Sequence, residues 1–395
     1  MNETRAAELP VQAARGQAIT TGLLASFVGF GSSFAVVVQG LVGVGADAAQ
    51  SASGLLVLSV GMGLLGILLS LRYRMPISVA WSTPGAALLA STGAPLGGFA
   101  AAVGAFLAVG ALILLAGLWR PLGRLVAAIP SSIANAMLAG VLFHLCVAPF
   151  LAIAEIPTLA LPVVLLWAVI ARFWRLYAVP AAVILAVALM FWNGAGPLPP
   201  TDQLWPQLTL VSPIFSWSAM VSIALPLFLV TMASQNIPGF AVLQANDFHP
   251  PSRPLIVTTG IGTMLVAPFG GHAVNLAAIT AALCAGPDAH PDRSRRYVAA
   301  VATGVGYILF GMLAVAATAW ISASPPLLIE AVAGLALLGA FGSALGNALA
   351  QPNDRDAALV TLIATASGMS FAGIGSAFWG LLAGGIMLAL RRLKP

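Results

Sequence analysis

The sequence predicts an all-α polytopic membrane protein with fourteen membrane-spanning segments, arranged as two inverted repeats of seven. The composition is 60% hydrophobic and only 7% charged. This excludes a soluble helical protein, because every solvent-facing helix would need charge. All sixteen Lys and Arg residues occur in eight clusters, with almost wholly apolar stretches between them. The clusters are Arg5/Arg15, Arg72/Arg74, Arg120/Arg124, Arg172/Arg175, Arg253, Arg293/Arg295/Arg296, Arg355 and Arg391/Arg392/Lys394.

The spacing of these clusters sets the number of crossings. Positive charge beside spans marks the cytoplasmic side, so all eight clusters and both termini are expected on the cytoplasmic face of the inner membrane. Most gaps hold about 40 to 60 residues, room for two segments of about 20 residues, and seven gaps of two crossings give fourteen. Asp47, Glu155 and Asp202 lie near the middle of gaps, as expected for the outer face. The longest gap could hold four crossings, but residues 193–212 are rich in proline and polar residues, which favours two.

Seven crossings in each half give the two halves opposite orientations, so the predicted repeat is inverted. The first repeat is expected over residues 17–195 and the second over residues 213–393. Aligning Pro76 with Pro268 places Thr83 opposite Asn275, which indicates that the halves are related around these positions.

The third span is too short to be one uninterrupted helix. Ser82-Thr83-Pro84 predicts a helix start with Thr83 as the N-cap. The helix is expected to end by Gly93, after about ten residues or 15 Å, which is half of what a bilayer needs. The preceding residues 77–81 are mostly β-branched or aromatic, and we expect them to be extended.

The tenth span is interrupted in the same way. The segment APFGGHAVNLAAITAALCAGP predicts a helix that begins with Asn275 as N-cap and ends near Ala285, whereas residues 269–274 are not expected to be helical. Backbone amides at membrane depth must be satisfied, so the two extended segments are expected to pair. Both half-helices then direct their N-termini at the protein centre, where free N–H groups and partial positive charge favour a carboxylate.

Ionisable and amide side chains inside the predicted spans are few. His272 is expected either to bond nearby backbone or to act in the pocket as a substrate donor or titrating group, because histidine titrates near neutral pH. Asn275 is expected to cap its helix, to bind substrate, or both. Glu330 is a second candidate for proton coupling, since charge at bilayer depth is costly. Its place near a helix N-terminus also allows a purely structural role.

The first and eighth spans carry further polar and aromatic candidates. The segment TMASQNIPGF contains Ser234, Gln235 and Asn236, of which one or two are expected to face inward. The alternative is a polar stretch at the cytoplasmic interface. In the first span, Phe30 lies beside two serines, where it either holds a flat ring or simply packs. Trp81, in the extended segment, is the better aromatic candidate.

Other classes of function are not supported. The chain shows no nucleophile–base pair, glycine-rich nucleotide loop or metal-spaced cluster, so we expect no enzyme activity, cofactor or metal. Cys146 and Cys284 are isolated in apolar segments and predict neither a disulfide nor a metal site. The net charge of +5 reflects membrane topology and does not indicate nucleic-acid binding.

Three segments, ASQNIPGFAVL, PFGGHAVNLAAITAA and AVAGLALLGAFGSAL, carry a resemblance to a known family. Together they resemble the benzoate/proton symporter family (BenE type), which is related to nucleobase/ascorbate transporters. The resemblance implies a core domain (spans 1–4 and 8–11, residues 17–118 and 213–322) and a gate domain (spans 5–7 and 12–14, residues 121–195 and 324–393). Substrate is expected between the broken third and tenth spans, beside the first and eighth. The candidate binding residues there are Phe30, Ser32, Ser33, Trp81, Ser82, Thr83, Gly85, Ser234, Gln235, Asn236, Gly271, His272 and Asn275.

One position departs from the related nucleobase transporters, which usually carry a carboxylate on the eighth span. This chain has Gln235 there, and loss of that charge suits a substrate that is itself an anion. His272, Glu330 or the substrate's own carboxyl group remain as proton carriers. The resemblance implies proton-coupled import of an aromatic carboxylate, above all benzoate, by elevator-like alternating access, and a homodimer formed through gate helices. The alternatives are a nucleobase or another anion on the same fold, or, less favoured, an anion channel.

Overall fold

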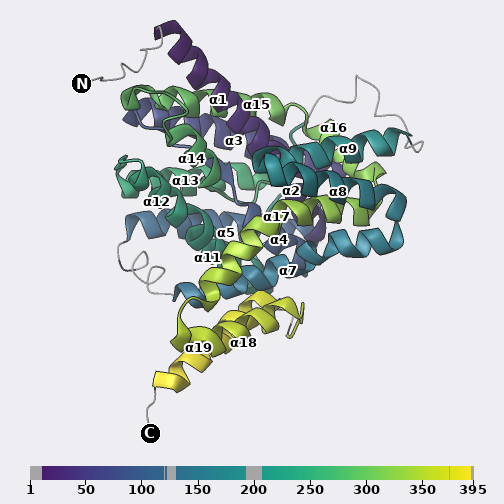
Figure 1. Cartoon of the computed structure of the whole chain (residues 1–395). Helices are drawn as coiled ribbons and strands as arrows, with labels where there is room; N and C mark the ends of the chain where they lie inside the picture. The colour runs from purple at the N-terminus through teal and green to yellow at the C-terminus, as the bar shows by residue number, and fades with distance from the viewer. Residues whose placement is uncertain (1–10, 120, 122–129, 193–206, 373, 393–395) are drawn as a thin grey trace.

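The structure, a computed structural model, describes residues 11–119, 121, 130–192, 207–372 and 374–392 (Figure 1). The predicted repeat ends at 195 and 393 lie outside the described residues. So do five charged residues used in the topology prediction: Arg5, Arg120, Arg124, Asp202 and Lys394.

The first half of the described chain is helical apart from one short strand. Its elements are α1 (Val11–Gly31), α2 (Phe34–Gly43), α3 (Ala48–Tyr73), β1 (Val79–Trp81), α4 (Thr83–Thr92), α5 (Gly98–Leu118), α7 (Ser131–Glu155), α8 (Pro157–Phe173) and α9 (Ala178–Trp192).

The second half has the same character, with two π turns (Met220–Ala224 and Met232–Asn236) inside its first long helix. Its other elements are α10 (Trp217–Ala219), α11 (Leu225–Thr231), α12 (Ile237–Ala245), α13 (Ser252–Val266), β2 (Val274–Leu276), α14 (Ile279–Ala285), α15 (Tyr297–Gly311), α16 (Ala314–Ala323), α17 (Pro326–Leu349), α18 (Arg355–Ala366) and α19 (Ser376–Arg392).

The predicted class of helical polytopic membrane protein is confirmed. Seven helices of the described chain are long and apolar enough to cross a membrane, and α15 with α16 forms a pair bent by 57° that makes an eighth if it is counted as one span. The helices Pro157–Phe173 and Ser376–Arg391 are apolar but shorter. The count of fourteen crossings stays a prediction, because α4 and α14 have only 10 and 7 residues and neither crosses a bilayer alone.

The predicted pairing of the two extended segments is also confirmed. β1 and β2 are antiparallel, with Val79 opposite Leu276 and Trp81 opposite Val274. α4 follows β1 after one residue and α14 follows β2 after two, so this ribbon lies between two half-helices. The strands pair because apolar surroundings offer their backbone amides no water.

Both predicted helix caps are wrong in position. Ser82 caps α4, because its extended backbone lets Oγ accept the N–H of Gly85 at 3.1 Å, while Thr83 is already helical. Asn275 lies in β2, and its side-chain amide donates to the carbonyl of Leu276 at 2.9 Å. The second half-helix starts only at Ile279, with two residues between it and β2, since strand pairing takes precedence over the early helix start that an asparagine cap predicts.

The other ends of the half-helices are as predicted. α4 ends at Thr92 with Gly93 as its C-cap, and α14 ends at Ala285. Residues 270–273 are not helical and Val274 begins β2, again as predicted, whereas Phe269 still belongs to a short 3-10 turn.

Glycines let the surrounding helices pack closely. A Cβ on Gly63 would lie 2.5 Å from the carbonyl oxygen of Gly304, and one on Gly304 would lie 2.6 Å from that of Gly63. α3 and α15 therefore touch backbone to backbone, as small residues allow in membrane helices. Gly110 on α5 and Gly260 on α13 make the equivalent contact. The labels of α3, α5 and α13 lie left of centre in Figure 1, with α8 and α9 towards the right.

Candidate functional site

The ribbon between the half-helices is held by side chains from neighbouring helices. The N–H of Leu276 donates to Oδ1 of Asn236 at 3.0 Å, and the N–H of Val274 donates to Oγ1 of Thr263 at 3.0 Å. Both bonds serve the outer edge of β2, whose amides would otherwise be unpaired in an apolar region. Asn236, a predicted substrate ligand, thus uses its side-chain oxygen to hold the ribbon.

His272 lies two residues before β2 and is completely buried. Its Nε2 is 3.0 Å from the carbonyl oxygen of Ser82. Because a carbonyl oxygen only accepts, Nε2 carries the hydrogen in that bond. Nδ1 is buried without a hydrogen-bond partner. Nε2 thus bonds to the backbone, and Nδ1 is the free polar atom of the side chain.

Asn275 carries a second free polar atom. Its Nδ2 donates to the carbonyl of Leu276, but Oδ1 is buried and has no partner. Buried polar atoms are normally paired, so two free ones within four residues of the chain make this segment a candidate binding site.

Ser82 connects the first half-helix to two other segments. Its Oγ accepts from the N–H of Gly85 at 3.1 Å and from the hydroxyl of Thr231 at 3.0 Å, and its carbonyl accepts from His272. All three side-chain groups involved are buried. Thr231 is not among the predicted residues, although it opens the polar segment TMASQN in the sequence.

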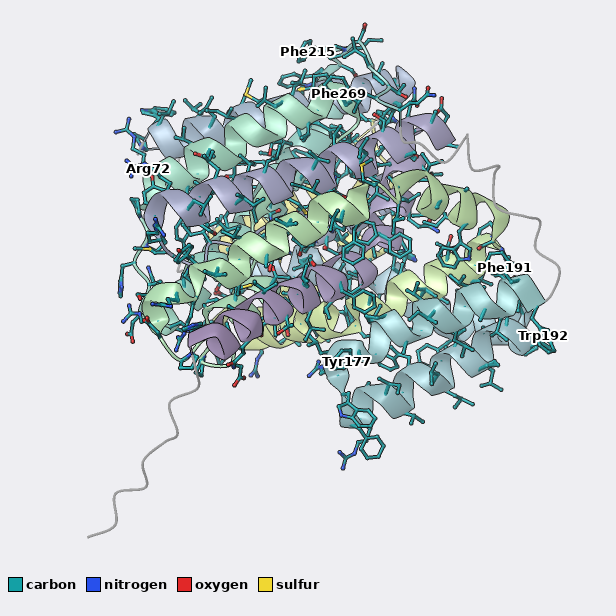
Figure 2. The ribbon with its side chains drawn as sticks, turned by 90° about the horizontal axis from the view of Figure 1, so that it is seen from above. Arg72, Tyr177, Phe191, Trp192, Phe215 and Phe269 are labelled. Atoms are coloured by element: carbon teal, nitrogen blue, oxygen red, sulfur yellow. The ribbon has the colours of Figure 1, made fainter. Side chains whose placement is uncertain are left out.

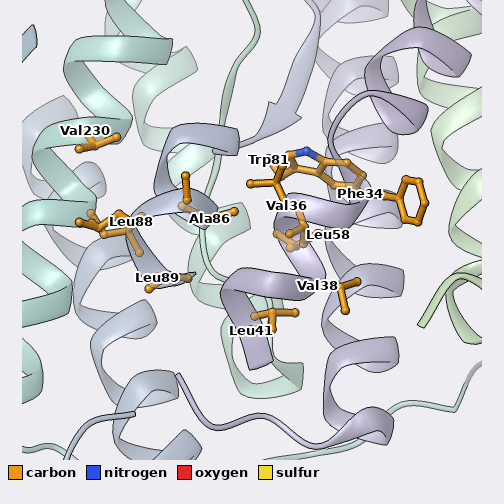
Figure 3. Packing of buried hydrophobic residues seen from close by; sticks show 14 of the residues in the cluster. Phe34, Val36, Val38, Leu41, Leu58, Trp81, Ala86, Leu88, Leu89 and Val230 are labelled. Carbon is orange, nitrogen blue, oxygen red and sulfur yellow. The ribbon is translucent and has the colours of Figure 1, made fainter. Parts of the chain in front are cut away.

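The predicted aromatic residues Phe30 and Trp81 lie in one cluster. Their ring centroids are 5.6 Å apart, and Phe30 also stacks on Phe34 at 5.5 Å and on Phe310 at 5.3 Å. The indole N–H of Trp81 donates to Oγ of Ser33 at 2.9 Å, so Ser33 fixes the orientation of the indole. Figure 3 shows Trp81 and Phe34 among the packed apolar side chains. Sequence reasoning missed Phe310, because a phenylalanine in an apolar span carries no distinguishing signal.

The remaining predicted residues differ in their accessibility. Gly85 and Gly271 are buried at the start of α4 and before β2. Glu330 is half-buried near the N-terminal end of α17, a helix that packs against α7. Four other predicted residues are half-buried and could meet a ligand without repacking: Ser32, Thr83, Ser234 and Gln235.

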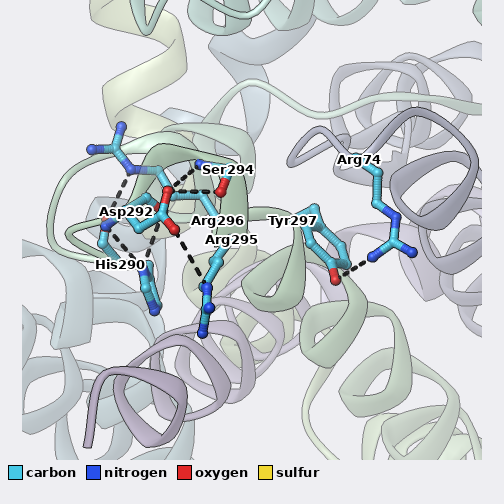
Figure 4. A network of polar contacts seen from close by, with 7 residues as sticks. All are labelled: Arg74, His290, Asp292, Ser294, Arg295, Arg296 and Tyr297. Atoms are coloured by element: carbon cyan, nitrogen blue, oxygen red, sulfur yellow. Dashed lines mark hydrogen bonds and ion pairs between the residues drawn. The ribbon is translucent and has the colours of Figure 1, made fainter. Parts of the chain in front are cut away.

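The far end of the second half-helix is capped by an arginine. Arg296 donates from Nη1 to the carbonyl of Ala285 at 2.8 Å and from Nε to the carbonyl of His290 at 2.9 Å. A cation at a helix C-terminus opposes the partial negative charge there. In the same network (Figure 4), hydrogen bonds from the side chain and backbone of Ser294 hold the pKa of Asp292 below its ordinary value.

The predicted ligands around the ribbon contribute little fixed charge. The predicted ligands around the ribbon are neutral, and His272 is the one among them that can gain positive charge. The start of α4 adds the partial positive charge of a helix N-terminus. α14 has only 7 residues, so its contribution is smaller, and the predicted pair of N-termini is unequal.

Comparison with known proteins identifies the family. Residues 12–390 match the family model described as Benzoate membrane transport protein (BenE). The chain belongs to this family. It is 41% identical over 377 residues to inner membrane protein YdcO of Escherichia coli strain K12, covering 95% of this chain and 96% of that protein. It is 35% identical over 379 residues to the benzoate membrane transport protein of Acinetobacter baylyi, with 96% and 95% covered.

The fold of the chain is similar to solved structures of a bicarbonate transporter and of an anion transporter. The transmembrane domain of the cyanobacterial bicarbonate transporter BicA matches with a TM-score of 0.62 and 14% identity, over 93% of this chain and 97% of that one. Murine Slc26a9 in its inward-facing state matches with a TM-score of 0.62 and 14% identity, over 98% of this chain and 70% of that one. At this identity the likeness concerns the fold alone. Family and fold together describe a multi-pass inner-membrane transporter.

Proposed function

We propose that this BenE family member imports an aromatic carboxylate, with benzoate as the first candidate, together with protons. The observation that carries the proposal is the hydrogen-bond pattern of His272, which links carboxylate binding to protonation. The relative named benzoate membrane transport protein, 35% identical over nearly the whole chain, supports the substrate class.

Proton coupling follows from the two ring nitrogens. Since Nε2 already donates to the Ser82 carbonyl, the neutral ring presents a bare Nδ1 lone pair, which repels a carboxylate. The protonated ring carries a hydrogen on Nδ1 that can be donated to a carboxylate oxygen. Each ligand then raises the affinity for the other, so proton and carboxylate bind together and leave together. Glu330, on the gate side, is the second candidate for this role.

Other parts of the site suit the rest of such a substrate. The half-buried residues Thr83, Ser234 and Gln235 offer neutral polar contacts beside the ribbon. Phe30 and Trp81 are buried in one aromatic cluster, which would pack against a phenyl ring once neighbouring side chains move aside. The neutral Gln235 avoids the repulsion that a carboxylate at this position would exert on an anion.

The packing of the helices supports the inverted repeat. In the predicted repeats, α3 corresponds to α13 and α5 to α15, and the contact of α3 with α15 is matched by that of α13 with α5. Likewise, the contact of α8 with α9 in the first repeat is matched by that of α18 with α19 in the second. The corresponding helices α7 and α17 pack on each other. Two repeats related by a pseudo-two-fold axis would produce such matched pairs, so we retain the repeats 17–195 and 213–393 with fourteen crossings.

Glycine contacts support a rigid core that moves against a rigid gate. Among the described glycines, every contact that a Cβ would make below 3.4 Å joins elements of the same predicted domain. The contacts that cross between domains are looser, at 3.8 Å from Gly31 to Pro180 and 3.6 Å from Gly375 to Thr92. Close backbone contacts resist sliding, so motion is easiest along the boundary between the core (17–118, 213–322) and the gate (121–195, 324–393).

The distribution of charged and aromatic residues supports the proposed orientation. In Figure 2, Arg72 lies at one end of the helices, and Phe191 and Trp192 lie at the opposite end. We place the Arg72 end and both termini on the cytoplasmic side, because arginine marks that side and tryptophan is enriched at interfaces.

Uptake of labelled benzoate into proteoliposomes tests the proposal. An inward proton gradient is expected to drive accumulation above equilibrium, and a protonophore is expected to abolish it. Absence of gradient-driven accumulation would overturn the proton coupling. Saturable uptake that uracil or sulfate inhibits more strongly than unlabelled benzoate does would move the substrate to one of the alternative classes. Uptake that neither saturates nor exceeds equilibrium would indicate a channel.

A further inference from the structure

The π turn Met232–Asn236 touches both half-helix segments. Thr231 directly precedes this turn and donates to Oγ of Ser82 at 3.0 Å, at the start of α4. Asn236 ends the turn and accepts from the N–H of Leu276 at 3.0 Å, in β2. Thr231 and Asn236 are both completely buried.

The π geometry is what allows this double contact. In an α-helix with 3.6 residues per turn, positions five apart lie about 140° apart around the axis and point to different sides of the helix. A π turn closes its hydrogen bond over five residues, which brings Thr231 and Asn236 towards the same face. The extra residue therefore turns one helix into a support for two separate segments of the chain.

We propose that Thr231 and Asn236 are positioning residues that fix the separation between the two half-helix segments. The same turn also contains Ser234 and Gln235, which are half-buried and are candidate ligands. A single element thus sets the position of the ribbon and of the polar groups beside it. The consequence for substrate affinity rests on the proposed function, whereas the structural role does not.

Each of the two hydrogen bonds supports a backbone N–H that has no other acceptor nearby among the described residues. Without Asn236, the N–H of Leu276 loses its acceptor on the outer edge of β2, while the neighbouring N–H of Val274 keeps its own bond to Thr263. Without the hydroxyl of Thr231, Oγ of Ser82 loses the donor that orients it towards Gly85. The effects are local, because each removes one hydrogen bond.

Amide hydrogen exchange of the purified, lipid-reconstituted protein provides a readout that is independent of substrate. In Asn236→Ala, exchange at Leu276 is expected to accelerate roughly five- to thirty-fold, while exchange at Val274 stays at the wild-type rate. In Thr231→Val, which keeps the side-chain volume, exchange at Gly85 is expected to accelerate by the same factor. In Thr231→Ser, which keeps the hydroxyl, exchange at Gly85 is expected to stay at the wild-type rate. Unchanged exchange at both amides would refute the positioning role.

Transport kinetics provide the second readout. Both variants are expected to raise the KM for benzoate roughly five- to thirty-fold with little change in Vmax, since the site loses its geometry and the moving domains are intact. Asn246→Ala and Thr361→Val are matched controls, because these side chains donate only to carbonyls of their own helices. If the wild-type protein takes up no benzoate, the proposed function fails, and exchange alone decides the positioning role. Normal KM in both variants with accelerated exchange would overturn the link to affinity.

Discussion

Replacing His272 with glutamine tests the proposed proton coupling most directly. The side-chain NH2 of glutamine can replace Nε2 of histidine as the donor to the Ser82 carbonyl. Glutamine has no counterpart of Nδ1 that gains a proton. The lost interaction is a buried hydrogen bond between a cation and a carboxylate, which is worth about 1.5–3 kcal/mol. We therefore expect apparent benzoate affinity at acidic pH to fall roughly ten- to 150-fold.

The KM for benzoate is expected to depend on pH in the wild-type protein and not in His272→Gln. In the wild-type protein, the fraction of His272 with a hydrogen on Nδ1 falls as pH rises, so KM is expected to rise with pH. In His272→Gln, KM is expected to be high at acidic pH and nearly independent of pH. Benzoate exchange between equal concentrations on both sides is expected to persist, while accumulation driven by a proton gradient is lost. The assay is initial-rate uptake into proteoliposomes over a series of external pH values.

His144→Gln is the matched control. Its Nε2 lies 2.7 Å from the carbonyl of Ala366, so it also bonds backbone through that nitrogen, but it belongs to α7 in the proposed gate. The control is expected to keep the wild-type pH profile. A transporting His272→Gln protein with unchanged pH dependence and full accumulation would refute the reasoning and leave Glu330 or the substrate's own carboxyl group as the proton carrier.

Three further outcomes test the structure around the site. Ser33→Ala leaves the indole N–H of Trp81 buried without its acceptor, so the free energy of unfolding is expected to fall by about 1–3 kcal/mol, read as a lower thermal midpoint. Gly304→Ala introduces a Cβ only 2.6 Å from a carbonyl oxygen of α3, so the free energy of unfolding is expected to fall by about 1–3 kcal/mol. In the control Gly342→Ala, the new Cβ meets nothing within 4 Å, and the thermal midpoint is expected to stay unchanged. Arg296→Ala removes two hydrogen bonds to carbonyls at and after the end of α14, and faster amide exchange in residues 286–292 is the expected result.

The breaks in the third and tenth spans were open to sequence reasoning, because they depend on local composition. Gly93 and Ala285 mark helix ends that the structure confirms, and the β-branched residues before α4 indicated an extended segment. The helix N-caps could not be predicted from local composition in the same way. Ser82 and Thr83 are both good N-caps, and only the backbone conformation selects between them. Asn275 is a good cap that strand pairing draws into β2 instead.

The candidate ligands show a similar division. Placing His272, Asn275 and Trp81 together required only the expectation that two extended segments pair. The free atoms, Nδ1 of His272 and Oδ1 of Asn275, became identifiable only from the hydrogen bonds that the structure gives the other atom of each side chain. Asn236 changed from an expected ligand to a support for the ribbon, because its acceptor points at the N–H of Leu276.

The sequence by itself determined that the chain lies in a membrane and where two of its helices stop short, because hydropathy and helix-breaking residues act over a few neighbouring positions. Only the tertiary structure decided which polar atoms are used to hold the backbone and which stay free. The partners of Asn236 and Thr231 lie 40 and 149 residues away along the chain, at Leu276 and Ser82. Hydrogen bonding across such separations depends on how the helices pack, and no local pattern in the sequence encodes it.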